Sequence, residues 1–477
     1  MKNFKMNVIS KILTLCTFLL LFSGLNLAYS QEEKPRVIVM TDGEIDDQSS
    51  MIRFLLYTND VDVEGIIYTN SIFQRQGWEA LKWIEKQIDA YDQVYRNLIV
   101  HDPTYPTADE LRSKIYIGDD DRTHLVSNRG GMTRVPGMEP QIDPANWSDT
   151  QGSDKIVEAL LKNDPRPVYI LAWGGGNTAA RAFYKLQHNY PEEYKKAASK
   201  AIMYNILYQD GAGNYIEKYH PEVTMLLCLH FSETWNYGAQ RYTKDFVDKY
   251  LHEGHGPLAK LYPQRYISEG DSPSFFYILP NGLRSRENPT YGGWGGQFYK
   301  VDGFENVYRD IDKGTYQRWI EYINRDFEAR LQWCVAEKYE DANHRPVIKI
   351  IGSLDRIVKS GETVVIEAEV TDPDSINPSD EWDIYAEVMS QGGVTEETWP
   401  KNSMLRSNHY GLWWQYKEAG NYNKMIDLPQ THSDKLTFIA PEVDEPSTIH
   451  MVLEVHDRNA PRLFSFARVI ITVMPAD

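Results

Sequence analysis

The order of apolar and polar runs between residues 36 and 70 constrains the fold more than any other part of the sequence. Residues 37–40 (VIVM) are all apolar, and the acidic stretch TDGEIDDQSS follows them. An apolar-rich stretch at 49–57 then precedes a second apolar run at 63–68 (VEGIIY). Short continuous apolar runs indicate strands that are buried on both faces. Two such strands with a helix between them form a parallel βαβ unit, so we expect an α/β fold.

The alternation of strands and helices continues to about residue 336. Further strands are expected at 167–172, 201–207 and 223–229, and helices at 78–95, 179–186 and 315–336. This order predicts a doubly wound, mainly parallel sheet.

The pattern changes after residue 345. Short alternating stretches separated by turns occur at 347–351, 363–370, 384–388, 436–440, 449–455 and 467–473. They predict an Ig-like β-sandwich. The polar residues 337–345 (EKYEDANHR) are interpreted as a linker between an α/β domain at 31–336 and a β-sandwich at 346–477, for which carbohydrate binding is one expected role.

The first thirty residues have the organisation of a secretory signal peptide. Three lysines precede the apolar run 12–22, and small residues stand at positions 28 and 30. We expect cleavage near Ser30/Gln31 and a secreted or periplasmic protein. A lipoprotein would use Cys16, but Leu15 before it is too large for that signal. No other stretch approaches the roughly 20 apolar residues that a membrane span requires.

The charge of the chain disfavours nucleic acid and anionic lipid as partners. The formal net charge is −18, and removal of three lysines and no acid with the signal peptide gives −21. Such a surface repels polyanions and favours a neutral or cationic partner, for which carbohydrate is our candidate. Cys228 and Cys334 lie in apolar stretches and are expected to be buried free thiols, although an oxidising compartment would permit a bridge.

Four carboxylates follow the first predicted strand within six positions: Asp42, Glu44, Asp46 and Asp47. Ligands of open α/β sheets bind beyond the carboxyl ends of the strands, where these residues are expected. A set of oxygen ligands without His or Cys suits Ca²⁺ better than Zn²⁺. Asp46 alone could be a helix cap, but that interpretation leaves the other three acids unexplained. The cluster therefore predicts a calcium site.

Three segments resemble the motifs of nucleoside hydrolases. They are TDGEIDD followed by a helix and EGIIYTN, the strand–turn–helix AWGGGNTAA, and the late segment EGDSP at 269–273. GDSPSFFYILPNGL, NPTYGGWGGQFY and GLWWQYKEAGNY resemble a subgroup of secreted nucleoside hydrolase-like proteins. The C-terminal domain of that subgroup is described as cellulose-binding, and the resemblance covers nearly the whole mature chain.

This resemblance implies a role for six residues. It implies that Ca²⁺ is held by Asp42, Asp47, the backbone carbonyl of Asn177 and Asp271, that Asp42 is also the general base, and that Asp46 and Asn70 contact the sugar.

The sequence departs from true nucleoside hydrolases on the side of the leaving group. Met40 replaces another Asp of the family, and Gly43-Glu44 replaces Pro-Gly. Gly270 stands where many members carry a His that protonates the leaving base. The family's Asn–Glu–Asn segment has no counterpart in residues 209–215. An ordinary nucleoside is therefore disfavoured, and Glu44 and Glu269 are candidates, by position, for contacting the substrate as an acid.

Two aromatic segments leave alternatives open. Trp294 lies among four glycines and could either stack on a sugar or pack into the core. Trp413 and Trp414 could form a platform for polysaccharide, but strand alternation sends one of them inward, and packing is favoured for the pair.

The function expected from the sequence is that of a secreted, Ca²⁺-dependent glycoside hydrolase that removes a furanosyl residue from a glycan-derived substrate. Asp42 and Asp46 are its expected catalytic residues. One alternative is a non-catalytic protein that binds cellulose or another polysaccharide. A weaker alternative is a true nucleoside N-ribohydrolase.

Overall fold

The computed structural model describes residues 33–75, 82–125, 136–235, 246–374, 409–428 and 431–476. The expected signal peptide and the expected strand at 384–388 lie outside these ranges. Residues Pro35–Asp477 form one compact unit. Within the described ranges, no helix has the length and apolar character needed to cross a membrane.

An eight-stranded sheet forms the centre of the α/β region, in the order β3-β2-β1-β4-β5-β6-β8-β7. Every neighbouring pair is parallel except β7 and β8. This confirms the predicted mainly parallel sheet. The strands are β1 (Arg36–Thr41), β2 (Asp62–Tyr68), β3 (Ile115–Ile117), β4 (Val168–Ala172), β5 (Ala201–Ile206), β6 (Thr224–Cys228), β7 (Phe298–Lys300) and β8 (Val307–Asp310).

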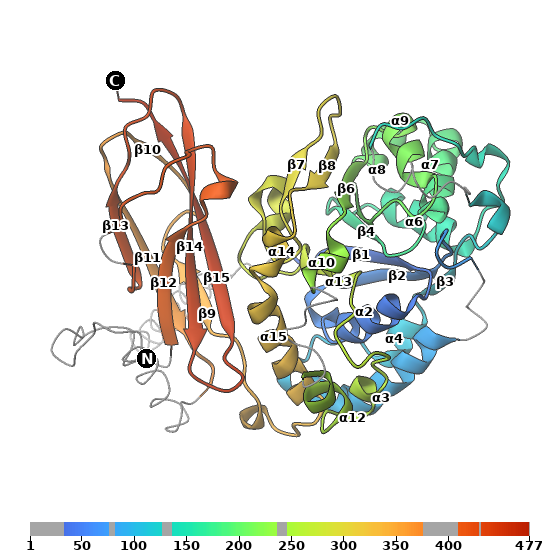
Figure 1. Ribbon diagram of the computed structural model, residues 1–477, viewed down its shortest axis with the longest axis horizontal. Helices are drawn as coiled ribbons and strands as arrows, with labels where there is room; N and C mark the ends of the chain where they lie inside the picture. The colour runs from blue at the N-terminus through green and yellow to red at the C-terminus, as the bar shows by residue number, and fades with distance from the viewer. Residues whose placement is uncertain are drawn as a thin grey trace, which may run out of the picture. The chain divides into compact units, whose positions relative to one another are not determined.

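Helices cover both faces of this sheet, as Figure 1 shows. Successive side chains of β1 point to opposite faces of the sheet. Val37 and Val39 pack in one core cluster, and Ile38 and Met40 pack in the other. The first cluster contains residues of α2 (Ile45–Leu55), α3 (Trp83–His101) and α15 (Ile320–Trp333). The second contains residues of α6 (Gln151–Leu161), α7 (Asn177–Asn189), α8 (Tyr194–Ala198) and α9 (Ala212–Tyr219).

The remaining helices are short. They are α4 (Ala108–Arg112), α10 (Phe231–Thr234), α12 (Gly256–Lys260), α13 (Ser272–Phe276) and α14 (Gly314–Gln317). The single helix expected at 315–336 is divided into α14 and α15. The division lies beside Trp319, whose ring is buried against Tyr416 and Phe466 of the C-terminal region.

The C-terminal region contains two further sheets. Their orders are β10-β15-β14-β12 and β13-β11-β9, and all pairs are antiparallel except β10 and β15. The strands are β9 (Val347–Ile350), β10 (Asp355–Lys359), β11 (Thr363–Thr371), β12 (His409–Gln415), β13 (Lys435–Ile439), β14 (Ser447–Asp457) and β15 (Phe464–Met474). Residues from both sheets share one hydrophobic core, which confirms the expected β-sandwich.

The two tryptophans of β12 have opposite environments. Trp413 lies in the sandwich core and is 1% exposed. Trp414 is half-buried, and its ring lies 6.3 Å from that of Trp319 in the α/β region. The expected alternation is therefore confirmed, but the outward ring contributes to packing and does not form an open platform. Cys228 and Cys334 are both free and buried, as predicted.

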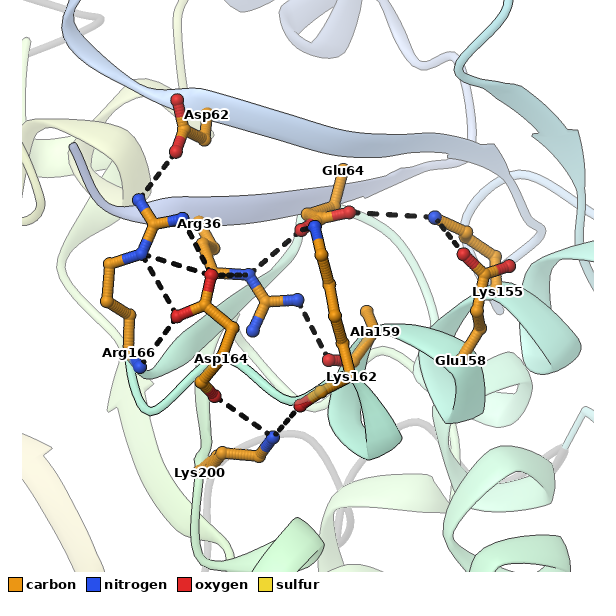
Figure 2. A network of polar contacts seen from close by, with 10 residues as sticks. All are labelled: Arg36, Asp62, Glu64, Lys155, Glu158, Ala159, Lys162, Asp164, Arg166 and Lys200. Carbon is orange, nitrogen blue, oxygen red and sulfur yellow. Dashed lines mark hydrogen bonds and ion pairs between the residues drawn. The ribbon is translucent and has the colours of Figure 1, made fainter.

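A charged network closes the amino edge of the sheet (Figure 2). Arg36 is fully buried; its Nε lies 2.9 Å from Glu64 Oε1, and its Nη2 donates to the carbonyl of Ala159. Lys162 Nζ also donates to Glu64 Oε1, at 3.0 Å. Burial alone would raise the pKa of Glu64, but the hydrogen bonds from Arg36 and Lys162 dominate and lower it to about 2. The acids at this edge are therefore neutralised by protein cations.

We predict that Glu64→Gln lowers the free energy of unfolding at pH 7 by about 2 kcal/mol. The folded pKa of Glu64 is depressed, so its contribution exists above the unfolded value near 4.5 and is lost as the pH falls toward 2. Urea denaturation of both proteins at pH 7, 4 and 3 measures the effect. A difference between wild type and variant that stays constant down to pH 3 would contradict it.

Candidate metal centre at the carboxyl edge of the sheet

The acidic motif occupies the turn between β1 and α2. Gly43 has a φ of +77°, a backbone conformation that favours glycine, and it lets the chain turn from the strand into the helix. Asp46 and Asp47 lie in the first turn of α2. The Thr41 hydroxyl and the Asp42 backbone N–H both donate to Asp47 Oδ1, the latter at 3.2 Å. These bonds fix the Asp47 carboxylate against the strand end.

Five predicted acids come together at this point. Carboxylate oxygens of Asp42, Glu44 and Asp47 lie within 4.8 Å of one another, and so do those of Asp46, Asp47 and Asp271. Asp271 precedes α13 and is far from the others in sequence. Because Asp47 belongs to both groups, the five carboxylates form one continuous oxygen-rich centre.

The buried members of this centre lack compensating partners. Asp42 is completely buried, and neither of its carboxylate oxygens has a hydrogen-bond partner. Asp271 is 2% exposed, and its Oδ2 also lacks a partner. In the part of the chain that the structure describes, no basic side chain forms an ion pair with Asp42, Asp47 or Asp271. Buried charges in proteins are normally paired or coordinate a metal, so these residues could hold a cation.

The pKa shifts of these carboxylates also favour a cation at this centre. Burial raises the pKa of Asp42 to about 8, and the charge of Glu44 adds to the effect. Burial, followed by the charge of a neighbouring aspartate, raises the pKa of Asp47 and that of Asp271 well above the usual range. Each of these carboxylates would be stabilised in its charged form by a bound cation. The residues therefore fit a hard divalent cation that prefers oxygen ligands.

The glycine turn after β4 forms the next wall of the centre. A Cβ atom on Gly174 would lie 2.7 Å from the Asp42 Cβ, and one on Gly175 would lie 2.4 Å from the Asn70 carbonyl oxygen. Gly175 N–H donates to that carbonyl at 3.0 Å. Glycine is needed at both positions because the backbone passes directly against Asp42 and Asn70.

Two predicted amides lie beside this turn. Asn70 follows β2 and is fully buried, and neither polar atom of its side chain has a hydrogen-bond partner. Asn177 is the first residue of α7; its Nδ2 donates to the His124 carbonyl at 3.3 Å, and its Oδ1 has no partner. The structure thus places both amides at the carboxyl edge. Coordination of a metal by the Asn177 carbonyl stays a prediction.

Sequence reasoning missed two groups at this edge. Asp210 follows β5 and accepts hydrogen bonds from the backbone N–H groups of Asn177 and Ala212 at 2.9 and 2.8 Å. Burial raises its pKa to about 6. His124 Nδ1 lies 2.7 Å from Asp119 Oδ2. For Asp119 and His124, the available sequence signal was the acidic run at 119–121 after the short strand β3. The α/β pattern alone did not single out this run.

Two residues for which a substrate contact was one expected role are buried in packing contacts. The side chains of Glu269 and Arg53 are both 0% exposed, and Arg53 Nη2 donates to Glu269 Oε1 at 2.9 Å. Tyr262 and Ser272 donate to the same carboxylate. Glu269 is therefore a buried structural partner of Arg53 and is closed to substrate.

Trp294 is 1% exposed, and the Arg345 guanidinium lies 5.2 Å from its ring centroid. Trp294 therefore packs in the core, and it is not an exposed stacking ring.

A mainly parallel α/β sheet with an acidic centre beyond β1 is compatible with a nucleoside hydrolase-like protein. The chain belongs to the family described as cellulose-binding Sde182, nucleoside hydrolase-like domain, whose model matches residues 36–298. The model described as cellulose-binding protein Sde0182, C-terminal domain, matches residues 407–473. No curated protein matches the chain.

One solved structure supports this assignment. The chain is similar to a nucleoside hydrolase-related hypothetical protein from Saccharophagus degradans, described as associated with carbohydrate metabolism. The two are 27% identical, with a TM-score of 0.75, and the match covers 93% of this chain and 100% of the other. A plant nucleoside hydrolase is also matched, at 13% identity and a TM-score of 0.35 over 63% of this chain and 99% of the other.

We predict that Asp42→Asn stabilises the chelator-treated protein by about 1–3 kcal/mol, because it removes an unpaired buried carboxylate while keeping its shape. Thermal unfolding with and without CaCl₂ measures this, and calcium should stabilise the wild type but not Asp42→Asn. Asp120→Asn, at an exposed acid near the same edge, is the matched control and should behave like wild type. A chelator-treated Asp42→Asn protein that is less stable than chelator-treated wild type would contradict the account.

Proposed function

We propose that this protein is a secreted, Ca²⁺-dependent glycoside hydrolase that releases a furanosyl residue from a glycan-derived substrate. The observation that carries the proposal is the pair of Asp42 carboxylate oxygens, which are fully buried and unpartnered beside four other acids. Membership of a nucleoside hydrolase-like family supports hydrolysis at an anomeric carbon.

The burial of the five acids suggests a division of roles. Asp42, Asp47 and Asp271 are buried and, with the Asn177 carbonyl, would hold the calcium ion. When bound, calcium would lower the pKa of a water molecule and bind vicinal hydroxyls of the sugar. Glu44 and Asp46 are only partly buried, so their carboxylates are open to substrate hydroxyls.

Asp42 is proposed as the general base. Its carboxylate lies among the residues that would hold the calcium ion, so it would be close to a water molecule bound by that ion. The transition state of glycoside hydrolysis carries positive charge on the sugar ring. The neighbouring carboxylates Asp46 and Asp47 would stabilise that charge, and Asn70 would donate or accept a hydrogen bond at a ring hydroxyl.

A glycan-derived substrate is favoured over a nucleoside for two reasons. Gly270 leaves the position before Asp271 without a side chain that could protonate a nucleobase. The printed descriptions of the family and of the Saccharophagus degradans protein refer to cellulose binding and carbohydrate metabolism. Glu269 is excluded as the acid because it is paired to Arg53. Glu44 is therefore the remaining carboxylate proposed to protonate the leaving group.

One observation favours a second candidate, a non-catalytic carbohydrate-binding protein. The more buried of the two candidate acids, Glu269, is held in an ion pair, which leaves the centre with fewer groups for leaving-group protonation. In that case the cation would hold sugar hydroxyls without turnover.

Hydrolysis of 4-nitrophenyl furanosides, compared with the matching pyranosides and with inosine and uridine, tests the proposal. We expect furanoside turnover that is lost with EDTA, restored by CaCl₂, and lowered at least about 10³-fold by Asp42→Ala. Asp120→Ala is the control and should retain activity.

The substrate panel separates the alternatives. Calcium-dependent binding of furanosides without turnover would favour the second candidate. Release of base from inosine or uridine as the main activity would identify a nucleoside hydrolase instead.

A further inference from the structure

A cavity of about 310 Å³ opens where residues 337–345 meet the sandwich. Its walls include Tyr339, Asp341 and Asn343 from this segment, Asp374 after β11, and Asn459 after β14. The segment was expected to be a linker, but it is built into the walls of this cavity. The volume is at the lower end of the range for small-molecule sites, which suits a single small ring.

A stack of aromatic rings ends at this cavity. The rings of Tyr339 and His344 are parallel within 2°, with centroids 3.7 Å apart. His344 stacks in turn on Trp333 and His101, at 5.3 and 5.2 Å. Tyr339 is 38% exposed, so the stack holds its ring in place while part of it faces the cavity. A ring fixed in advance binds a ligand with little loss of conformational freedom.

Hydrogen bonds fix one residue of the cavity wall, Asn343. Asn343 Nδ2 donates to Asp457 Oδ2 at 2.6 Å and to the Pro461 carbonyl at 2.8 Å, which sets the orientation of its amide. Asn343 is 4% exposed, and its Oδ1 has no partner. This part of the wall is therefore fixed before a ligand binds.

The charged residues of the cavity wall limit the chemical class of ligand that can bind. Glu340, Asp341 and Asp374 contribute carboxylates, and none of the lining residues is basic. Anionic ligands are therefore disfavoured, whereas hydroxyl groups can donate to the carboxylates. A ligand that offers an apolar ring face and several hydroxyl donors matches all of these features.

We propose that this cavity binds one sugar ring of a neutral polysaccharide. The C–H face of the ring packs on Tyr339, and its hydroxyls donate to the exposed wall carboxylates of Glu340 and Asp341. Of the described residues, the exposed aromatic side chains are Phe73, Tyr219, Tyr299 and Tyr339, and among them only Tyr339 lines the cavity. This site is separate from the acidic centre and requires neither calcium nor turnover.

Binding of cellohexaose by calorimetry and retention on insoluble cellulose test the proposal with the full mature chain. We expect Tyr339→Ala to weaken binding at least tenfold and Tyr339→Phe to change it less than twofold, because the ring face makes the contact. Tyr299→Ala, at an exposed tyrosine of β7 outside the cavity, is the matched control and should bind like wild type. Asp341→Ala, at an exposed wall residue, should weaken binding without touching the aromatic stack.

Three results would overturn the proposal. The first is binding by Tyr339→Ala and Asp341→Ala that equals that of wild type. The second is a wild type that binds none of cellohexaose, xylohexaose and mannohexaose. The third is loss of binding in Asp42→Ala instead, which would assign the sugar to the acidic centre. Furanoside hydrolysis should be unchanged in Tyr339→Ala, so failure of this site and failure of the proposed hydrolase are distinguishable.

Discussion

The mutual repulsion of carboxylates beyond β1 is the constraint on which the site depends. In a poorly hydrated environment, like charges a few ångströms apart are strongly unfavourable. The chain neutralises its acids at the opposite edge of the sheet, where Arg36 and Lys162 hold Glu64 ionised. At the carboxyl edge, Asp42, Asp47 and Asp271 form no ion pair with a basic side chain among the residues that the structure describes. This contrast within one sheet fits a carboxyl edge that could hold an external cation.

The scaffold brings the two halves of the acidic centre together through a buried ion pair. Arg53 lies on α2, which carries Asp47, and Glu269 lies two residues before Asp271. The fully buried contact between Arg53 and Glu269 therefore joins the helix of the first acids to the segment of the last one. The Arg53 guanidinium also lies 3.8 Å from the Phe327 ring centroid, which connects this pair to α15. A residue expected to contact substrate thus has a positioning role.

The local sequence was sufficient for the main strands and for the first acids, because buried parallel strands are continuous apolar runs and the acids follow one of them directly. Asp271 could be placed only through a family resemblance, since its proximity to Asp47 depends on tertiary folding. The alternatives for Glu269 and Trp294 stayed open in the sequence because their partners, Arg53 and Arg345, are distant along the chain. The short strand β3 carries too few residues for a clear pattern. The polarity of 337–345 suggested a linker, although its aromatic and amide side chains are ordered by contacts with distant residues.

Calcium titration by isothermal calorimetry on chelator-treated protein tests the central claim most directly. Wild type and Asp271→Asn form the decisive pair, because Asp271 joins the centre only in the folded chain. The account predicts one-to-one binding by wild type and at least a tenfold weaker affinity in Asp271→Asn, with Asp120→Asn unchanged. Absence of calcium binding by the wild type, or equal affinity in Asp271→Asn, would contradict it.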